Sequence, residues 1–434
     1  MKIVAPGLSI ISLTSDTVTA GTPARQKALL LVHSGGSRYS FQADPCGSNN
    51  SKGSLRLVFH PTTDEKAVCE VRWRTTPSRS LRNRGWKRLK VEGSRGHAFS
   101  AYRLYVNDRG QQPRDVVILL EKPDTANFLS RIPDDTPLGD ITLPGTHESC
   151  AMYGYPISQC QQPATPIEQQ LLDGVRFLDV RLRVVGDELL MYHGPRPQRS
   201  TLAQLLIVLH QFLDTHPSET LILSIKQETP PWHPHFSQIL YQAFLPFLDK
   251  WFLEERIPTL GEVRGKGMLL TRFDRDKDGD MSWENGMGIH PYTWPDSRKE
   301  GFEWDCAGTI VRTQDWYRVH TFLEIPEKFN AITTHLLPTL DSPSSCRTFT
   351  LSYLSASYFP LSLPTIIAKG FGWPSWGLGV EGINSRMFRW LLERFADGQR
   401  VRACLAIDFY RQCAGDAGLA ELLIQMNFIG EDDL

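Results

Sequence analysis

The chain has 434 residues, of which 41% are hydrophobic and 22% charged, and this is ordinary usage for a globular protein. The length exceeds one ordinary domain and suits two domains with substantial cores. The formal net charge of −1 argues against general polyanion binding, so no nucleic-acid partner is expected. No apolar run is long enough for a transmembrane helix, so any membrane contact should be peripheral.

The first twenty residues allow two interpretations. Lys2, the apolar range 3–13 and the small pair at 19–20 are arranged as in a secretory signal. Pro6 and Gly7 interrupt the apolar range, however, so the first strand of an N-terminal domain is favoured. We therefore expect a cytoplasmic or peripheral membrane protein, with secretion as the less favoured alternative.

The eight cysteines form no CxxC motif and no Cys/His cluster with metal-ligand spacing. Cys150 and Cys160 are close enough in sequence to form a disulfide. Reduced, buried thiols are nevertheless favoured in a chain without a clear export signal.

Residues 1–123 have the pattern of a β domain. Short β-branched or aromatic runs, several of which alternate with period two, lie at 27–33, 55–60, 69–74, 98–106 and 115–121. Because no helix-period stretch of useful length separates them, they predict a small all-β, sandwich-like domain. Between Arg72 and Arg95, nine basic residues are accompanied by the single acid Glu92. Such a run either binds anionic lipid headgroups, as a membrane or partner contact, or is a solvated face.

Residues 127–434 alternate strands with helices. Apolar strand candidates lie at 140–144, 175–180, 188–192, 220–225, 268–272, 308–313, 349–355 and 401–407, and helix-period stretches lie at 201–215, 236–248 and 387–395. The alternation predicts an α/β fold with a parallel sheet, and eight strands predict a closed (β/α)8 TIM-like barrel. The second and third strands are too close for an intervening helix, so the barrel should be irregular there.

Reactive side chains lie on or directly after these strands. His147 ends the run Ile141-Thr-Leu-Pro-Gly-Thr-His, His193 ends Leu189-Leu-Met-Tyr-His, and the run between them carries Asp179 and Arg181. Reactive groups of barrels cluster at the C-terminal ends of the strands, so these side chains should meet. One imidazole can take a proton, the other can give one, and a guanidinium can hold a phosphate oxygen. These are the groups that phosphodiester cleavage needs.

Four segments resemble the X-type catalytic domain of phosphatidylinositol-specific phospholipase C, most closely the single-domain bacterial type. They are Leu143-Pro-Gly-Thr-His-Glu-Ser, Arg176-Phe-Leu-Asp-Val-Arg, Tyr192-His-Gly and Glu219-Thr-Leu-Ile-Leu-Ser-Ile-Lys, in the family's order. The resemblance implies a phosphoric diester hydrolase acting on a phosphatidylinositol-type lipid, or a glycosylated form, at a membrane surface. The products would be diacylglycerol and an inositol cyclic phosphate, which is then opened to the phosphate.

The resemblance also implies roles for the site residues. His147 would be the general base for the inositol hydroxyl, and His193 the general acid for the diacylglycerol oxygen. Asp408, which follows the last strand, would partner His147, although an Asp there could also cap a helix. Asp179 would partner His193 in the same way. Arg181 would stand where animal members place a calcium-ligating acid, so neither Ca²⁺ nor another cofactor is expected.

Further residues match family positions that hold the inositol ring. They are Lys226, Arg272, Asp315 and Tyr317, for which a set of rim salt bridges is the alternative. Glu148 stands where bacterial relatives usually carry Asp, and its role is open between orienting a hydroxyl and packing at the strand end.

Residues 274–285 and the segment that contains Trp373 and Trp376 each allow two interpretations. The range 274–285 begins like an EF-hand loop but has Asn285 at its twelfth position, so a solvated loop is favoured. Trp373 and Trp376, in a Gly-rich segment, either enter a lipid interface or pack on the barrel.

The alternative function is a catalytically silent, phosphoinositide-binding barrel that recruits the protein to membranes. The presence of both histidines disfavours this alternative.

Overall fold

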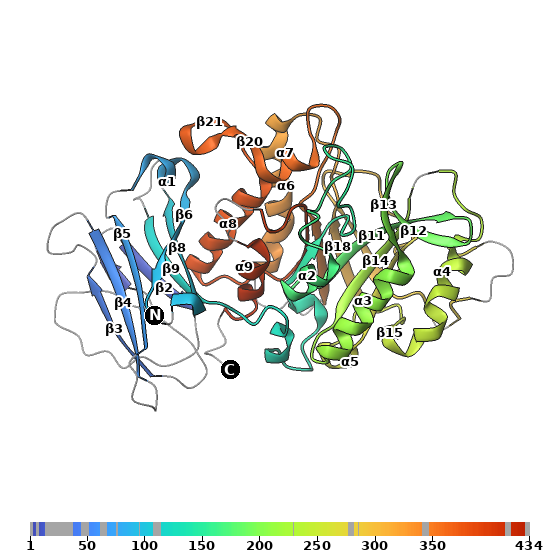
Figure 1. The fold of residues 1–434 in the computed structure, drawn as a ribbon, viewed down its shortest axis with the longest axis horizontal. Helices are drawn as coiled ribbons and strands as arrows, with labels where there is room; N and C mark the ends of the chain where they lie inside the picture. Colours follow the sequence, from blue (N-terminus) through green and yellow to red (C-terminus); the bar gives the residue numbers. More distant parts are fainter. Residues whose placement is uncertain are drawn as a thin grey trace.

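The computed structural model describes residues 77–94, 96–106, 114–228, 230–276, 282–284, 286–340, 347–412 and 418–429, together with the strands between residues 3 and 74 given below. A part built of strands forms the N-terminal end of the molecule, and a larger α/β part follows it (Figure 1).

Two sheets form the N-terminal part. A four-stranded antiparallel sheet has the order β3 (Arg38–Asp44), β4 (Lys52–His60), β5 (Ala67–Arg74) and β7 (Val91–Glu92). A five-stranded sheet has the order β1 (Ile3–Ala5), β2 (Leu8–Leu13), β9 (Arg114–Glu121), β8 (Phe99–Val106) and β6 (Trp86–Leu89). The ranges 55–60, 69–74, 98–106 and 115–121, predicted as strands, fall on β4, β5, β8 and β9, whereas 27–33 lies outside the described residues. The sandwich-like architecture and the boundary near residue 123 stay predictions.

One curled sheet forms the larger part. Its path is β15 (Trp251–Phe252), β16 (Gly267–Arg272), β14 (Leu221–Gln227), β11 (Phe177–Val185), β10 (Leu143–Thr146), β22 (Cys404–Ile407), β19 (Thr348–Tyr353), β18 (Thr309–Gln314) and β17 (Phe302–Cys306). All neighbours from β15 to β18 are parallel, as predicted. Among the described residues no strand pairing joins β15 to β17, so this barrel is curled but open, whereas a closed ring was expected.

The third expected barrel strand was assigned wrongly. The range 188–192 forms β12 (Glu188–His193), which runs antiparallel to β11 and pairs on its other side with β13 (Arg196–Thr201). The reason is local: the pair Val185 and Glu188 closes a two-residue hairpin at Gly186, whose φ of 63° suits a tight turn. A parallel return would need a crossover of a dozen or more residues.

Helices lie outside the sheet and between its strands in sequence, except for the last helix, which follows β22. They include α2 (Ile167–Leu172), α3 (Leu202–Thr215), α4 (Phe236–Phe244), α6 (Ile325–Leu336), α7 (Pro364–Lys369), α8 (Ile383–Asp397) and α9 (Leu419–Met426). The predicted helix at 201–215 is α3, which begins with a capping box between Thr201 and Gln204. Leu205 and Leu209, four residues apart, are buried on its inner face.

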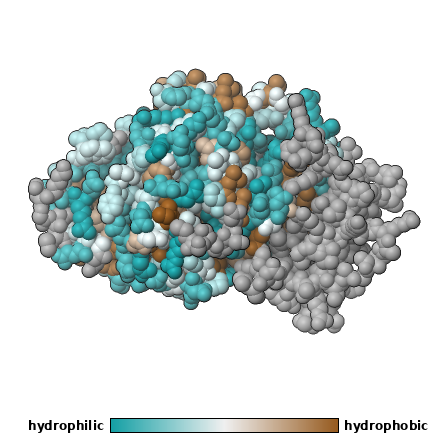
Figure 2. Space-filling model, turned by 180° about the vertical axis from the view of Figure 1, so that it is seen from behind, coloured by the Kyte–Doolittle hydropathy of each residue, from teal (hydrophilic) through white to brown (hydrophobic). Residues whose placement is uncertain are grey.

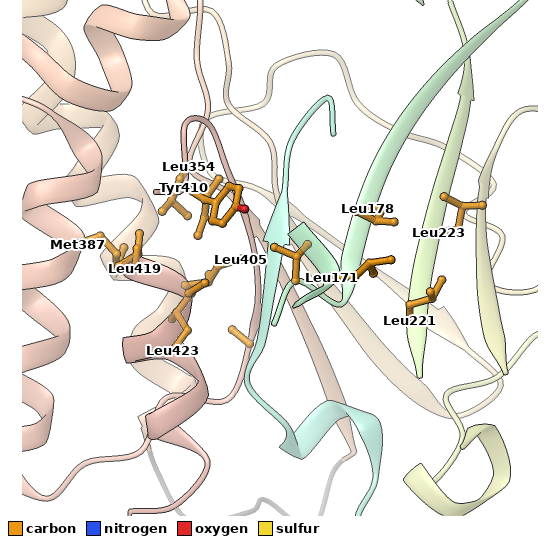
Figure 3. Close-up of a cluster of buried hydrophobic side chains, with 14 of the residues drawn as sticks. Leu171, Leu178, Leu221, Leu223, Leu354, Met387, Leu405, Tyr410, Leu419 and Leu423 are labelled. Atoms are coloured by element: carbon orange, nitrogen blue, oxygen red, sulfur yellow. The ribbon is translucent and has the colours of Figure 1, made fainter. Parts of the chain in front are cut away.

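The helices bury their apolar faces against the outer face of the curled sheet. On one side Met387 of α8 and Leu419 and Leu423 of α9 point toward Leu405 of β22 (Figure 3). On the other side Leu171 of α2 lies near the strand residues of β11 and β14. This packing holds the strand ends, and therefore the side chains that follow them, in fixed positions.

The two parts share a packed contact. Trp86 of β6 is 1% exposed and stacks on Phe388 of α8, with ring centroids 4.3 Å apart. Tyr102 of β8 meets the same phenylalanine edge to face at 5.2 Å. An aromatic cluster of this kind fixes the N-terminal strands against α8.

The described cysteines are free thiols. Cys150 and Cys160 are not joined to each other, and burial raises the pKa of Cys150 to about 12.

Candidate active site

His147 and Asp408 are brought together by two neighbouring strands. β10 ends at Thr146 and β22 ends at Ile407, and these two residues are register partners in the parallel sheet. The residues that follow them therefore lie side by side. The Nδ1 atom of His147 lies 2.8 Å from Oδ1 of Asp408.

This contact sets the protonation of the imidazole. Nδ1–H donates to the Asp408 carboxylate, and the Nε2 lone pair accepts from an N–H of Arg181 at 3.1 Å. Burial lowers the pKa of His147, but the charge and hydrogen bond of Asp408 overcome this effect, so the net shift is upward. The ring is therefore basic, with its unprotonated nitrogen on the side of Arg181.

Arg181 is the central cation of the site. It lies on β11, which continues past the other strands, and its side chain is half-enclosed among acids. Its Nε lies 2.5 Å from Oε1 of Glu148, its Nη1 lies 3.6 Å from Oε2 of Glu228, and its Nη2 lies 4.0 Å from Oδ2 of Asp179. Burial opposes the charge of Arg181, but these acids outweigh it and hold the pKa well above its usual value.

His193 reaches the site on the return strand of the β11–β12 hairpin. Its Nδ1–H donates to the carbonyl of Ser158 at 2.9 Å, which leaves Nε2 facing Oε1 of Glu148 at 3.9 Å. The next residue, Gly194, donates its N–H to Glu228 at 2.9 Å, and this bond anchors the end of β12. Burial, followed by the charges of Arg181 and His147, lowers the pKa of His193 to about 4.

The predicted pairing of Asp179 with His193 was wrong. Oδ2 of Asp179 lies 3.9 Å from Nε2 of His147 and accepts from the backbone N–H of Glu148 at 3.3 Å, and the carboxylate also contacts Arg181 and Arg272. The hairpin is the physical reason, because it places the ring of His193 against Glu148 instead. Burial raises the pKa of Asp179, but Arg181 and Arg272 together lower it further, so the group is an anion.

Glu148 links the guanidinium to the second imidazole. It is 2% exposed and adopts a φ of 44°, in the left-handed region that a glutamate seldom occupies. This turn after β10 aims its carboxyl at Arg181 and His193. Burial raises the pKa of Glu148 to about 8, against the attraction of Arg181. The carboxyl can therefore carry a proton near neutral pH.

Three cations form a row across adjacent strands. Arg181, Lys226 and Arg272 are register partners on β11, β14 and β16, so their side chains lie on the same face of the sheet. Burial, then Arg181 and Arg272, lowers the pKa of Lys226. Such a row attracts an anion, and its far end is held by Asp315, which lies 3.5 Å from Arg272.

Two aromatic rings enclose Arg272. Its guanidinium lies 3.8 Å from the ring centroid of Trp294, and its Nη1–H donates to the hydroxyl of Tyr353 at 3.3 Å. Trp294 in turn donates to Asp315 at 2.8 Å. Tyr317 lies farther out, at the rim, where its hydroxyl donates to Asp296. The structure therefore joins Arg272 and Asp315 to the centre and leaves Tyr317 at the edge.

Several site residues escaped the sequence analysis. Glu228 lies just beyond β14, and Tyr353 ends β19, so the strand-end rule that selected Lys226 could have found both. Trp294 comes from an irregular segment with no periodic signal. Lys328 of α6 is fully buried and donates to the carbonyls of Trp316 and Tyr353 at 2.7 and 2.8 Å, although burial lowers its pKa to about 7.

The groups able to ligate a metal are few in the described part of the chain. His147, Cys160 and Asp408 offer ligand atoms within 4.8 Å of one another. Of these, His147 and Asp408 are already hydrogen-bonded to each other. In the EF-hand-like segment, the Asp276 carboxylate accepts from the N–H groups of Ser237 and Gln238 in the first turn of α4, while residues 277–281 and 285 lie outside the description.

Residues 137–273 match the family model of the X domain of phosphatidylinositol-specific phospholipase C. The chain is 31% identical over 159 residues to the 1-phosphatidylinositol phosphodiesterase of Listeria monocytogenes, which covers 34% of this chain and 49% of that protein. It is 26% identical over 207 residues to the enzyme of the same name from Staphylococcus aureus (strain Newman), which covers 44% of this chain and 64% of that protein. The chain thus spans between about half and two thirds of these relatives. The resemblance seen in the sequence motifs is confirmed.

Solved structures support the fold. Phosphatidylinositol-specific phospholipase C from Staphylococcus aureus, in a pentafluoro-Phe form, superimposes with a TM-score of 0.55 at 20% identity, over 70% of this chain and 98% of that one. The enzyme from Listeria monocytogenes does so with a TM-score of 0.50 at 22% identity, over 70% and 98%. At such identities the likeness concerns the fold, and it agrees with the irregular TIM-like barrel.

Proposed function

We propose that this chain, whose residues 137–273 form an X domain of the phosphatidylinositol-specific phospholipase C family, cleaves phosphatidylinositol or a glycosylated form of it. The products are diacylglycerol and an inositol cyclic phosphate, which is opened in a second step. The relatives from Listeria and Staphylococcus are both named 1-phosphatidylinositol phosphodiesterase, and this supports the choice of lipid.

One observation carries the proposal: a chain of contacts through the guanidinium of Arg181 joins an imidazole that can accept a proton to an imidazole that can donate one. The unprotonated Nε2 of His147 accepts a hydrogen bond from Arg181 at 3.1 Å. Arg181 contacts Glu148 at 2.5 Å, and Glu148 lies 3.9 Å from Nε2 of His193. A phosphate bound to Arg181 therefore has a base on one side and a proton source on the other.

In the first step the inositol hydroxyl next to the phosphate is the nucleophile. Its oxygen bonds to phosphorus while its proton passes to Nε2 of His147, and Asp408 stabilises the resulting imidazolium. The bond from phosphorus to the diacylglycerol oxygen breaks, and that oxygen receives a proton from the His193–Glu148 pair.

The His193–Glu148 pair supplies this proton as a unit. His193 alone is a weak reservoir, since its pKa falls to about 4, whereas that of Glu148 rises to about 8. A bound phosphodiester adds negative charge beside His193 and favours its cation. In the second step a water molecule replaces diacylglycerol, gives its proton to the pair, and attacks phosphorus. The inositol oxygen leaves with the proton from His147.

We propose further that the reaction requires no metal. Negative charge develops on the non-bridging phosphoryl oxygens, and Arg181 already places a fixed cation there. Lys226 and Arg272 extend the positive region toward the inositol ring. Together with Asp315, they offer donors and acceptors for the ring hydroxyls, and Tyr317 offers an aromatic face at the rim.

We place the working protein at a membrane surface. None of the described helices is long and apolar enough to cross a bilayer. The β20–β21 hairpin (Gly370–Trp373 and Leu378–Glu381) exposes Trp373 by 69% and Trp376 by 66%, which favours a lipid interface over packing on the barrel. In the coloured part of Figure 2, which is mostly hydrophilic, apolar residues lie along the upper edge and in smaller patches below it.

The test is hydrolysis of phosphatidylinositol in mixed micelles, with diacylglycerol followed by chromatography and the phosphorus product by ³¹P NMR, with and without EDTA. We expect a cyclic phosphate first, and equal rates with EDTA. His147→Ala and Arg181→Lys should each lower kcat by at least about 10²-fold. Arg183→Lys, two residues along the same strand, is the matched control. Binding of the lipid by the wild-type protein without any product would instead support the silent-barrel alternative.

A further inference from the structure

The N-terminal part contains a strongly basic hollow outside the active site. Its volume is about 390 Å³, and it lies between β5, β6 and the helix α1 (Arg79–Arg84). Its described lining includes no acidic side chain and six cations, which are Arg72, Arg74, Lys87, Arg88, Lys90 and Arg103. Such a concentration of one charge repels itself unless an anion occupies it.

Some of these cations are already neutralised. Arg72 makes two bonds of 3.0 Å to Glu70, Lys90 lies 2.7 Å from Glu92, and Arg103 lies 2.7 Å from Asp115. Within the described part of the chain, neither Arg74 nor Lys87 is paired with an acid. The hollow therefore keeps an excess of positive charge after the pairs are counted.

Buried side chains hold part of the hollow in a fixed shape. Arg103 is 3% exposed and donates to the carbonyl of Arg74 as well as to Asp115, so β8 fixes the backbone of Arg74. Trp73 and Leu81, both buried, form an apolar base. The hollow thus combines a buried, fixed arginine, several exposed cations and buried apolar side chains, which suits a phosphate-bearing group.

The helix α1 joins the hollow to the aromatic hairpin. Leu81 of α1 lines the hollow, and Asn83 of the same helix donates to the carbonyl of Ser375, between Trp373 and Trp376, at 3.1 Å. Figure 1 shows α1 and the β20–β21 hairpin beside each other along one edge of the molecule. The helix ends at Arg84 and is capped by Gly85, where φ is 82° and a Cβ would lie 2.7 Å from the side chain of Arg389 of α8.

We propose that this hollow is a second lipid site, which takes the phosphate-bearing headgroup of an anionic phospholipid while the hairpin enters the same bilayer. The N-terminal part would thereby supply charge-selective attachment outside the active site. The choice of a bilayer as partner, in place of a free anion, rests on the proposed function, because an enzyme acting on a lipid must dwell at its surface. The exposed indoles next to α1 support the same choice.

The test is binding to sucrose-loaded vesicles of phosphatidylcholine with and without phosphatidylserine, which contain no substrate. We expect tighter binding when phosphatidylserine is present. The double variant Arg74→Gln/Lys87→Gln should weaken that binding by roughly tenfold to thirtyfold, at about 1 kcal/mol for each cation. Its binding to pure phosphatidylcholine should be unchanged.

The matched control removes two cations elsewhere. Lys122 follows β9, and Lys266 precedes β16 at the end of the barrel opposite the active site, and both are exposed. Lys122→Gln/Lys266→Gln should bind phosphatidylserine vesicles as the wild-type protein does. An equal loss in both double variants would mean that only net charge matters, and no loss in the first would remove the site.

Two further readouts separate this proposal from the others. Hydrolysis of a water-soluble inositol phosphodiester should be the same in the Arg74/Lys87 variant and the wild type, so that failure of catalysis and failure of lipid binding are distinguished. Calorimetry with inorganic phosphate and inositol hexakisphosphate provides the other. Binding of these free anions at the hollow without any preference for phosphatidylserine vesicles would overturn the lipid assignment in favour of a soluble ligand.

Discussion

Nδ1 of His147 lies 2.8 Å from the carboxylate of Asp408, although 261 residues separate the two in sequence. The contact exists because β10 and β22 are parallel neighbours in the sheet, with Thr146 opposite Ile407. It leaves Nε2 of His147 as the unprotonated, basic nitrogen, hydrogen-bonded to Arg181, and the proposed first step requires this protonation state.

Replacing Asp408 by Asn should lower kcat by about 10²- to 10⁴-fold, because an amide neither fixes the tautomer nor stabilises the imidazolium. Asp408 raises the pKa of His147 against burial and Arg181, so its loss should move the acid limb of kcat/KM to lower pH. The measurement is the pH profile on a water-soluble inositol phosphodiester. An acid limb that stays in place would mean that another group sets it.

Glu148→Gln should remove the proton reservoir of His193. In the wild-type protein the pair must be protonated, so activity should fall as the pH rises past about 8, the pKa of Glu148. The variant should be about 10²-fold slower and should lose that alkaline limb. Glu188→Gln, an exposed glutamate on β12, is the control and should keep both the rate and the profile. An unchanged limb in Glu148→Gln would assign the proton to a different group.

Trp373→Ala/Trp376→Ala should weaken binding to phosphatidylcholine vesicles by at least about tenfold. Each indole that becomes buried in the bilayer should contribute on the order of 2 kcal/mol to the free energy of binding. Turnover of a soluble substrate should be unaffected, since the hairpin does not touch the catalytic groups. Leu337→Ala is the comparison: this leucine is 49% exposed and follows α6, at the end of the barrel away from the active site. Equal losses in both variants would exclude a specific role for the hairpin.

Trp86→Ala should destabilise the protein by about 3–5 kcal/mol, because it opens a cavity between β6 and α8 where the ring stacks on Phe388. Guanidinium unfolding followed by circular dichroism measures the change. Ile207→Ala, on the exposed face of α3 and 66% exposed, should alter stability by no more than about 0.5 kcal/mol. A similar small change for Trp86→Ala would show that the N-terminal strands are not anchored by this contact.

The local patterns of the sequence were enough for much of the fold and for part of the site. Apolar runs ending in His147, Lys226 and Arg272 identified parallel strands and the end at which chemistry occurs, because strand periodicity and strand termini are encoded by adjacent residues. The same reasoning identified Asp408 as a neighbour of His147, since the last strand of such a sheet returns beside the first.

The tertiary structure alone decided which side chains meet. The antiparallel β11–β12 hairpin carries His193 to Glu148 and not to Asp179, and an irregular segment brings Trp294 over Arg272. Likewise, packing of α1 against the hairpin near Ser375 joins a basic hollow to two exposed indoles almost 300 residues later in the chain. Contacts of this kind depend on how distant elements pack, and no local window of residues contains that information.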